Sequence, residues 1–273
     1  MAQPVIKWSG SKRKLAKFIV PHIPHSGTYF EPFVGGGSIL GALGPRKSFA
    51  GDVIPELVDL WNTIKKSPTE LAQKYERHWN GLQNEGHTYY YEVRESFNKK
   101  RKPEDLLFLS RTCVNGLIRF NSTGDFNNSL HHTRPGIHPT TLSNIIHEWS
   151  NLISDTTFMA TDYRKLLAKA KQGDIVYLDP PYMGNKGRYQ KLDFNFEELW
   201  ETLDGLNTKK IFWILSLDGK SGDRNYSQAL QEPLKLSRQS YLLDGENSAF
   251  PRLLNKRLDK VKESLFINFK SKI

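Results

Sequence analysis

The sequence predicts an α/β fold in which a helical segment interrupts a strand-forming domain. Residues 28–33 form a short apolar stretch that runs into three glycines and then a helical pattern, a strand-turn-helix unit. Residues 175–178, Ile-Val-Tyr-Leu, are typical of a central strand buried on both faces. Most of the intervening chain has helical periodicity instead. We therefore expect one domain from residues 1–55 and 156–273, with a second domain, residues 56–155, inserted into it.

The composition indicates a globular protein with a polyanionic partner. The chain has 273 residues, of which 38% are hydrophobic, enough for a real core. Lys and Arg number 39 against 29 Asp and Glu, a formal charge of +10 that favours nucleic acid, although a solvated basic surface is the alternative. Cys113 is the single cysteine, so no intramolecular disulfide can form and a reducing compartment is expected.

The N-terminus and the apolar runs argue against export or membrane insertion. No apolar run approaches the length of a membrane span, so we expect no membrane partner. The first residues lack the charged-then-apolar order of a signal peptide, so we expect a cytoplasmic protein.

Two early segments offer groups that could bind a nucleotide-like ligand. Residues 7–12, Lys-Trp-Ser-Gly-Ser-Lys, offer backbone N–H groups and an ammonium to an anion, although the spacing is not that of a Walker loop. A capped helix start with solvated lysines is the alternative. The glycine turn at residues 35–37 allows a ligand to approach the backbone, but its spacing departs from the dinucleotide fingerprint.

Acidic residues stand at three further strand exits. A strand at residues 48–52 ends in Asp52, where an acid commonly binds ribose hydroxyls, although Asp52 could instead cap the helix near Pro55. A strand at residues 157–161 precedes Asp162 and Tyr163. The strand at residues 175–178 precedes Asp179-Pro180-Pro181-Tyr182. The apolar runs at residues 211–216 and 264–269 predict two more strands.

The Asp-Pro-Pro-Tyr segment can hold a planar ring that bears an amino group. Each proline lacks an N–H and cannot continue a strand ladder, which leaves carbonyl oxygens free to accept hydrogen bonds. Asp179 adds a carboxylate acceptor and Tyr182 an aromatic face for stacking. An ordinary strand-to-turn exit is the alternative, because Asp and Pro are common turn residues.

Within the inserted domain, residues 115–128 interrupt the helical pattern with turn-forming residues, which predicts loops or a hairpin. The segment is rich in Asn and Arg, the side chains that form paired hydrogen bonds with adenine and guanine edges in the major groove. His131 and His132 follow without Cys or acidic partners at ligand spacing, so we prefer DNA contact or a surface role over a metal site.

Taken together, residues 7–12, residues 30–37, residues 115–127 and residues 179–182 resemble the Dam-type DNA adenine-N6 methyltransferases of the alpha group. The motifs occur in that family's order. The resemblance implies a Rossmann-like mixed-sheet methyltransferase domain with an inserted, mostly helical DNA-recognition domain. It also implies S-adenosylmethionine as methyl donor, no metal, and double-stranded DNA as substrate.

The resemblance assigns roles to individual residues. The expected catalytic residues are Asp179, Pro180 and Tyr182. The expected contacts to S-adenosylmethionine are Trp8, Lys12, Phe33, Gly35, Asp52, Asp162, Tyr163 and Asp179. The expected DNA-facing residues are Lys7, Asn115, Arg119, Asn121, Asn127 and Arg134.

The chain departs from the Dam pattern after Asn128, where residues 129–139 replace the short basic-aromatic turn of the family hairpin. The tetranucleotide GATC is therefore not carried over. Cytosine-N4 methylation and a non-catalytic DNA-binding protein with this fold stay open as alternatives, and a nucleotide hydrolase has the least support. We expect a bacterial or phage-type protein that acts on DNA as a monomer, with a cognate restriction enzyme as an open partner.

Overall fold

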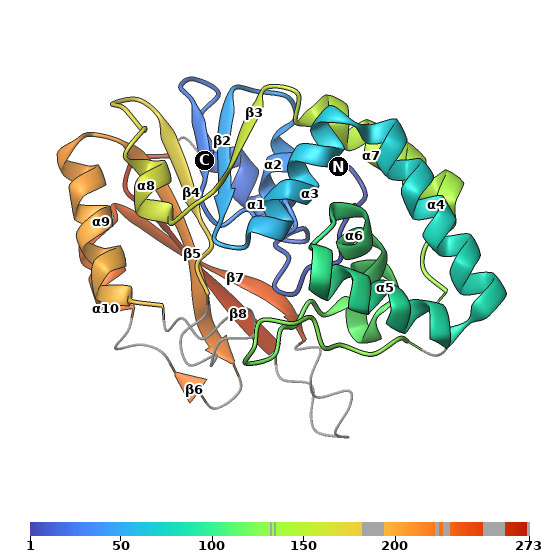
Figure 1. The fold of residues 1–273 in the computed structure, drawn as a ribbon. Helices are drawn as coiled ribbons and strands as arrows, with labels where there is room; N and C mark the ends of the chain where they lie inside the picture. Colours follow the sequence, from blue (N-terminus) through green and yellow to red (C-terminus); the bar gives the residue numbers. More distant parts are fainter. Residues whose placement is uncertain are drawn as a thin grey trace.

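The computed structural model describes residues 1–131, 133, 135–181, 194–221, 224–225, 230–247 and 260–271. Within these residues the strands form one sheet in the order β3-β2-β1-β4-β5-β8-β7, with β6 paired to β5 (Figure 1). The strands are β1 (Tyr29–Glu31), β2 (Ser48–Asp52), β3 (Thr156–Ala160), β4 (Ile175–Leu178), β5 (Phe212–Ser221), β6 (Arg224–Asn225), β7 (Gln239–Asn247) and β8 (Lys260–Ile267).

The strand directions make this a mixed, Rossmann-like sheet. Strands β1 to β5 run parallel, whereas β8 runs antiparallel to both of its neighbours, β5 and β7. The order reverses between β1 and β4, and open α/β sheets bind their ligands at such a switch point, outside the carboxyl ends of the strands. The predicted α/β fold is confirmed.

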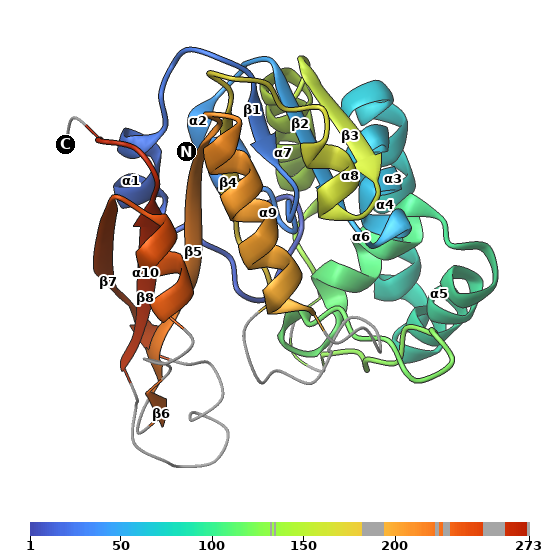
Figure 2. The same ribbon diagram turned by 90° about the vertical axis from the view of Figure 1, so that its left-hand side faces the viewer.

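Successive side chains along each strand point to opposite faces of the sheet, and both faces are buried. Phe30, Val176 and Trp213 pack with leucines of α8 (Tyr163–Leu167) and α9 (Phe196–Thr208). Tyr29 and Tyr177 pack in the opposite cluster, which continues into the N-terminal helices. Figure 2 shows α8, α9 and α10 (Gln231–Leu236) along one face, whereas α1 (Ala16–Ile19), η1 (Val20–His22) and α2 (Ser38–Leu43) belong to the other.

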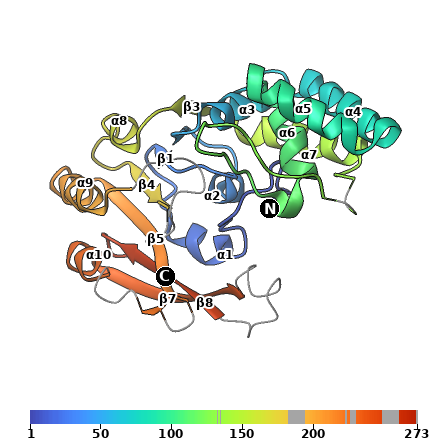
Figure 3. The same cartoon turned by 60° about the horizontal axis from the view of Figure 1, so that its bottom comes forward.

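A helical insertion separates β2 from β3. It consists of α3 (Pro55–Lys66), α4 (Pro68–Glu85), α5 (His87–Lys100), α6 (Pro103–Thr112), η2 (Val114–Gly116) and α7 (Pro139–Leu152). Four of these helices begin with a proline, which suits the first turn because its missing N–H would have no helical partner. Figure 3 shows them gathered beside the β3 edge, with β7 and β8 at the other edge.

The insertion shares a hydrophobic core with the sheet. Trp61 of α3 stacks on Phe158 of β3 at 5.7 Å between ring centroids, and it contacts Trp149 of α7 at 5.0 Å. The two-domain division at residues 56–155 stays a prediction. In the described part of the chain, no helix is both long enough and apolar enough to cross a membrane.

Candidate active site

The sheet brings three of the predicted strand exits together. Because β1 lies between β2 and β4 in parallel register, the glycine turn after β1 has Asp52 on one side and Asp179 on the other. These residues therefore surround the switch point between β1 and β4. The fold places acidic and glycine-rich segments from three distant parts of the chain at one edge.

Asp52 ties the glycine turn to the start of the insertion. Its Oδ2 accepts a hydrogen bond from Gly35 N at 3.2 Å, and its Oδ1 accepts one from Ile54 N at 3.2 Å. Burial raises the pKa of Asp52 to about 6, against the opposing effect of these N–H donors. Ile54 occupies the N-cap position of α3, so the alternative reading of Asp52 as that helix's cap was wrong.

The glycine turn has no room for side chains. Gly35 has φ +45°, and a Cβ added there would lie 2.6 Å from Trp8 Nε1. On the other side, Trp61 Nε1 donates to Gly35 O at 3.0 Å. Trp8 and Gly35, both predicted from the sequence, are thus neighbours, and Trp61 is a supporting residue that sequence reasoning missed.

Asp179 is held by two side chains, Lys12 and Ser216, which have further partners of their own. Lys12 Nζ lies 2.8 Å from Asp179 Oδ1 and 3.1 Å from Glu263 Oε1, and the lysine is only 4% exposed. Ser216 of β5 donates to Asp179 Oδ1 at 3.3 Å, and Ser216 in turn shares a 2.8 Å hydrogen bond with Tyr177 OH. Burial raises the pKa of Asp179, and Lys12 opposes that rise.

A second carboxyl group stands behind Asp179. Glu31, the last residue of β1, is 3% exposed and accepts a 2.7 Å hydrogen bond from Tyr29 OH. Burial is the main cause that raises the pKa of Glu31 to about 8, and the negative charge of Asp179 adds to it. Glu31 therefore carries a proton near neutral pH, which limits the negative charge at the site.

Aromatic rings cluster beside the exits of β1 and β3. Phe33 lies 5.3 Å from Tyr163 and 5.7 Å from Phe194, centroid to centroid. Asp162 instead caps α8, accepting from Arg164 N at 2.9 Å, and pairs with Arg164 Nε at 2.8 Å. Its predicted ligand contact stays a prediction. Sequence reasoning missed Phe194. The feature of the sequence that could have indicated it is an aromatic residue next to a polar loop.

The Pro-Pro-Tyr part of the motif is described only in part. Pro180 is buried, Pro181 is exposed, and Tyr182 lies outside the described residues. Arg134, predicted to face DNA, and His132 also lie outside them. Their predicted roles stay predictions.

The segment between η2 and α7 contains the expected hairpin. Antiparallel bridges join Phe120 to Phe126 and Cys113 to Leu130. Asn121 was predicted to face DNA. Its Oδ1 accepts hydrogen bonds from Thr123 N and Asp125 N, so this side chain stabilises the turn of the hairpin. The exposed Arg119 donates through Nε to Asn127 Oδ1 at 2.8 Å, which brings these two predicted residues together.

One face of α5 holds this hairpin by its backbone. Asn98 donates to Phe126 O at 3.1 Å and accepts from Phe126 N at 2.8 Å. Tyr90 OH and Arg94 both donate to Asn128 O, and Arg101 donates to Gly124 O. Sequence reasoning missed this contact, although the spacing of these polar residues along the helix was its signal.

Lys7 packs against η2, which precedes the hairpin, and its neighbour Trp8 packs against the glycine turn. A Cβ on Gly116 would lie 2.5 Å from Lys7 Cδ, so the N-terminal loop packs against η2. Asn115, beside it, is exposed with φ 57°, a left-handed conformation that asparagine tolerates. Lys7 and Arg111 also line a cavity of about 190 Å³ with Thr133, Pro135, Gly136 and Ile137.

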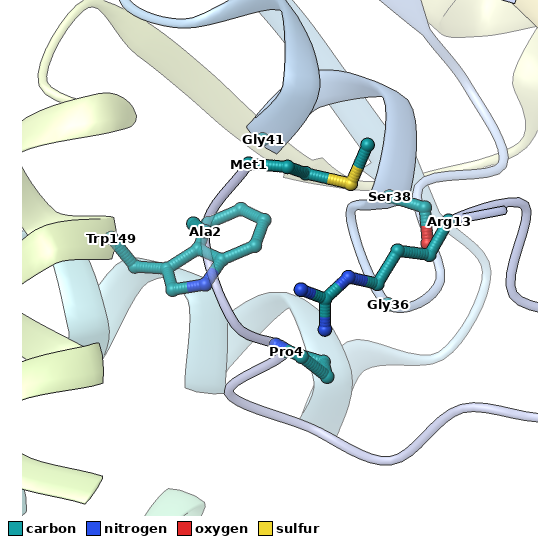
Figure 4. A pocket seen from close by; sticks show the side chains of 8 residues that line it. All are labelled: Met1, Ala2, Pro4, Arg13, Gly36, Ser38, Gly41 and Trp149. Atoms are coloured by element: carbon teal, nitrogen blue, oxygen red, sulfur yellow. The ribbon is translucent and has the colours of Figure 1, made fainter. Parts of the chain in front are cut away.

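A smaller cavity adjoins the glycine turn, with Gly36 in its lining. Figure 4 shows it between Met1, Arg13 and Trp149, and its volume is about 10 Å³. That is room for a single water at most. This cavity is therefore too small to hold a cofactor or a substrate.

The family model for the D12 class N6 adenine-specific DNA methyltransferases matches residues 8–241, from the N-terminal loop to the middle of β7. The chain belongs to this family. The family acts on N6 of adenine in DNA, so this is an adenine-N6 DNA methyltransferase, and membership implies S-adenosylmethionine as methyl donor.

Curated relatives agree with the family. Type II methyltransferase M1.LlaDCHI of Lactococcus lactis subsp. cremoris is 29% identical over 78% of this chain and 80% of its own length. The DNA adenine methylase of Escherichia coli (strain K12) is 28% identical, covering 77% and 79%. That of Serratia marcescens is 30% identical, covering 65% and 66%. A solved rRNA methyltransferase of Streptomyces viridochromogenes aligns at 14% identity and a TM-score of 0.40, covering 98% and 90%.

Proposed function

We propose that this enzyme methylates N6 of an adenine at a specific sequence in double-stranded DNA after the base has rotated out of the helix. The observation that carries the proposal is Asp179, a partly exposed carboxylate at the switch point that is anchored on one oxygen by Lys12 and Ser216. A target adenine inside a duplex cannot reach such a recessed group, which is why base flipping is part of the proposal.

The residues on the Asp52 side fit S-adenosylmethionine. The Asp52 carboxylate stands where the ribose hydroxyls of nucleotides are bound in this type of sheet. Phe33 and Tyr163 supply an aromatic wall for the adenine ring, and Gly35 keeps side chains out of the turn. Trp8 and Lys12 extend this surface toward Asp179. When bound, S-adenosylmethionine supplies an electrophilic methyl group on a sulfonium.

Asp179 and the Pro180 carbonyl would accept hydrogen bonds from the two N–H groups of the target amine. These acceptors favour a more tetrahedral nitrogen, whose lone pair is then less delocalised into the ring. The nitrogen would form a new bond to the methyl carbon as the carbon–sulfur bond breaks with its electron pair left on sulfur, and one N6 proton would be released to solvent. Positioned acceptors lower the cost of the positive charge that develops on nitrogen. Tyr182 would stack on the flipped base, contributing about 1–3 kcal/mol.

The DNA side of the proposal rests on the hairpin and the N-terminal loop. Arg119 and Asn115 are exposed, and both Arg and Asn read base edges in the major groove. Lys7 lies between the hairpin and the strand exits, where it would meet the DNA close to the flipped base. Asn121, Asn127 and Arg134 complete the proposed surface.

We also propose that one chain acts on DNA as a monomer in the bacterial cytoplasm, because a single chain supplies both the donor side and the DNA side. A restriction enzyme that cuts the same sequence is the proposed biological partner, in keeping with the type II name of the Lactococcus relative.

Expression in a host that lacks DNA methylation would test this function. Sequencing the modified bases reports the base, its position and its context together. The proposal expects N6-methyladenine in one recurring sequence, and digestion to nucleosides should show no N4-methylcytosine. Methylcytosine, or methyladenine without a recurring sequence, would contradict it.

A further inference from the structure

Glu263 is a buried carboxylate next to the catalytic group, and it lies outside the residues that the family model matches. It stands on β8, which pairs on one side with β5, Glu263 opposite Asp218, and on the other with β7, Glu263 opposite Leu243. A strand held on both sides has a well-defined register. The residue is 4% exposed, so its carboxylate is buried for a reason that local sequence does not explain.

Glu263 and Asp179 share one cation. Lys12 Nζ lies 3.1 Å from Glu263 Oε1 and 2.8 Å from Asp179 Oδ1. Lys12 therefore carries its positive charge between two carboxylates. Without Glu263, the positive charge of Lys12 would act more strongly on Asp179, and a carboxylate that is more strongly paired with a cation is a weaker acceptor for a further hydrogen bond.

We infer that Glu263 is a positioning residue for methyl transfer: it divides the charge of Lys12 so that Asp179 stays an effective acceptor for the target amine. This inference rests on the proposed role of Asp179. By this inference, a residue of β8, 84 positions further along the chain, adjusts the charge that surrounds Asp179.

The groups around Asp179 determine how its pKa should change when Glu263 is replaced. Asp179 faces Lys12 of the N-terminal loop, Glu31 of β1, Tyr177 of β4, Ser216 of β5 and Glu263 of β8 through Lys12. A neighbouring negative charge raises the pKa of a carboxyl group. Removing Glu263 should therefore lower the pKa of Asp179, and activity should persist to lower pH.

Glu263→Gln and Glu263→Asp in the full-length protein separate charge from shape. Glutamine keeps the size and loses the charge, whereas aspartate keeps the charge and shortens the side chain. With saturating S-adenosylmethionine and DNA, we expect Glu263→Gln to lower the single-turnover rate about 10- to 100-fold. Its acid limb should also move to lower pH, and DNA affinity should stay unchanged. Glu263→Asp should be faster than Glu263→Gln.

Glu232→Gln is the matched control, because Glu232 is exposed on α10 and pairs with Lys235 away from the site. It should behave as the wild type. A Glu263→Gln enzyme with the wild-type rate and acid limb overturns the inference, as does a faster Gln than Asp variant. If the Gln variant does not fold, Glu263→Met, which is uncharged and of similar size, takes its place, and an unshifted acid limb in that variant overturns the inference. A wild-type enzyme that does not methylate adenine refutes the proposed function instead.

Discussion

The ammonium of Lys12 lies 2.8 Å from the carboxylate of Asp179, although 167 positions separate the two residues in the chain. Lys12 comes from the loop that packs against the glycine turn, and Asp179 ends the central strand β4. The pair therefore joins the proposed donor side to the proposed target side. It also means that changes on either side should alter the chemistry of the other.

Gly35→Ala should weaken S-adenosylmethionine binding. The new Cβ would lie 2.6 Å from Trp8 Nε1, so Trp8 must move away from the turn. Gly44→Ala is a matched control, because Gly44 also has a positive φ but open space around it. Both changes should cost about 1–3 kcal/mol of unfolding free energy from backbone strain. Titration calorimetry should show lost affinity for Gly35→Ala alone, and equal affinity in both variants would contradict the role of the turn.

Asn98→Asp should loosen the hairpin between η2 and α7, which we propose reads the DNA sequence. Aspartate can still accept from Phe126 N, but it cannot donate to Phe126 O, which leaves that carbonyl facing a negative charge. We expect a stability loss of about 1–3 kcal/mol. The ratio of methylation at the cognate site to methylation at single-mismatch sites should fall.

Glu95→Gln, on the exposed side of the same helix, serves as the control for Asn98→Asp and should leave that ratio unchanged. An Asn98→Asp enzyme that discriminates as well as the wild type would show that the hairpin does not need this clamp.

Arg119→Ala should relax sequence preference at one position of the site, at a cost of about 1–3 kcal/mol of discrimination. Lys7→Ala should instead weaken binding to all DNA sequences similarly and reduce the salt dependence of binding. Binding assays with substituted duplexes at several salt concentrations distinguish the two results. If Arg119→Ala weakens binding to all DNA sequences equally, Arg119 does not contact a base.

Glu31 should make the protein more stable at low pH than at high pH. Its pKa rises from the ordinary 4.5 to about 8 in the folded protein. The resulting stabilisation is fully present below pH 4.5 and is lost as the pH rises through 8. Glu31→Gln imitates the protonated form, so thermal unfolding should show that it loses less stability than the wild type between pH 6 and pH 9, the range about the shifted pKa. Parallel pH curves for the two proteins would contradict this protonation state.

Strand exits were predictable from the sequence because their signals are local. The apolar run before Asp179 and the glycines after Phe33 indicate a buried strand and a tight turn by themselves. Gln239–Asn247, which forms β7, has no such run, and it becomes a strand through pairing with β8. The local pattern therefore identified the parallel core better than the antiparallel edge.

Side chains whose role depends on a distant partner could not be predicted. Glu263 meets Lys12 only because β8 enters the sheet beside β5, and Asn98 meets Phe126 only because the hairpin folds back on α5. Asp162 shows the opposite case. Its position before a helix is a local capping signal, and the structure uses it as a cap.

The single-turnover rate of Asp179→Ala tests the central claim most directly. The variant should fold and still bind duplex DNA, because Asp179 is one polar side chain at the end of a strand buried on both faces. With saturating donor and DNA, formation of N6-methyladenine should fall about 100- to 1,000-fold, as expected for the loss of a positioned group that stabilises developing charge. Methyl transfer near the wild-type rate would show that Asp179 is not the acceptor for the target amine, and the proposed mechanism would be wrong.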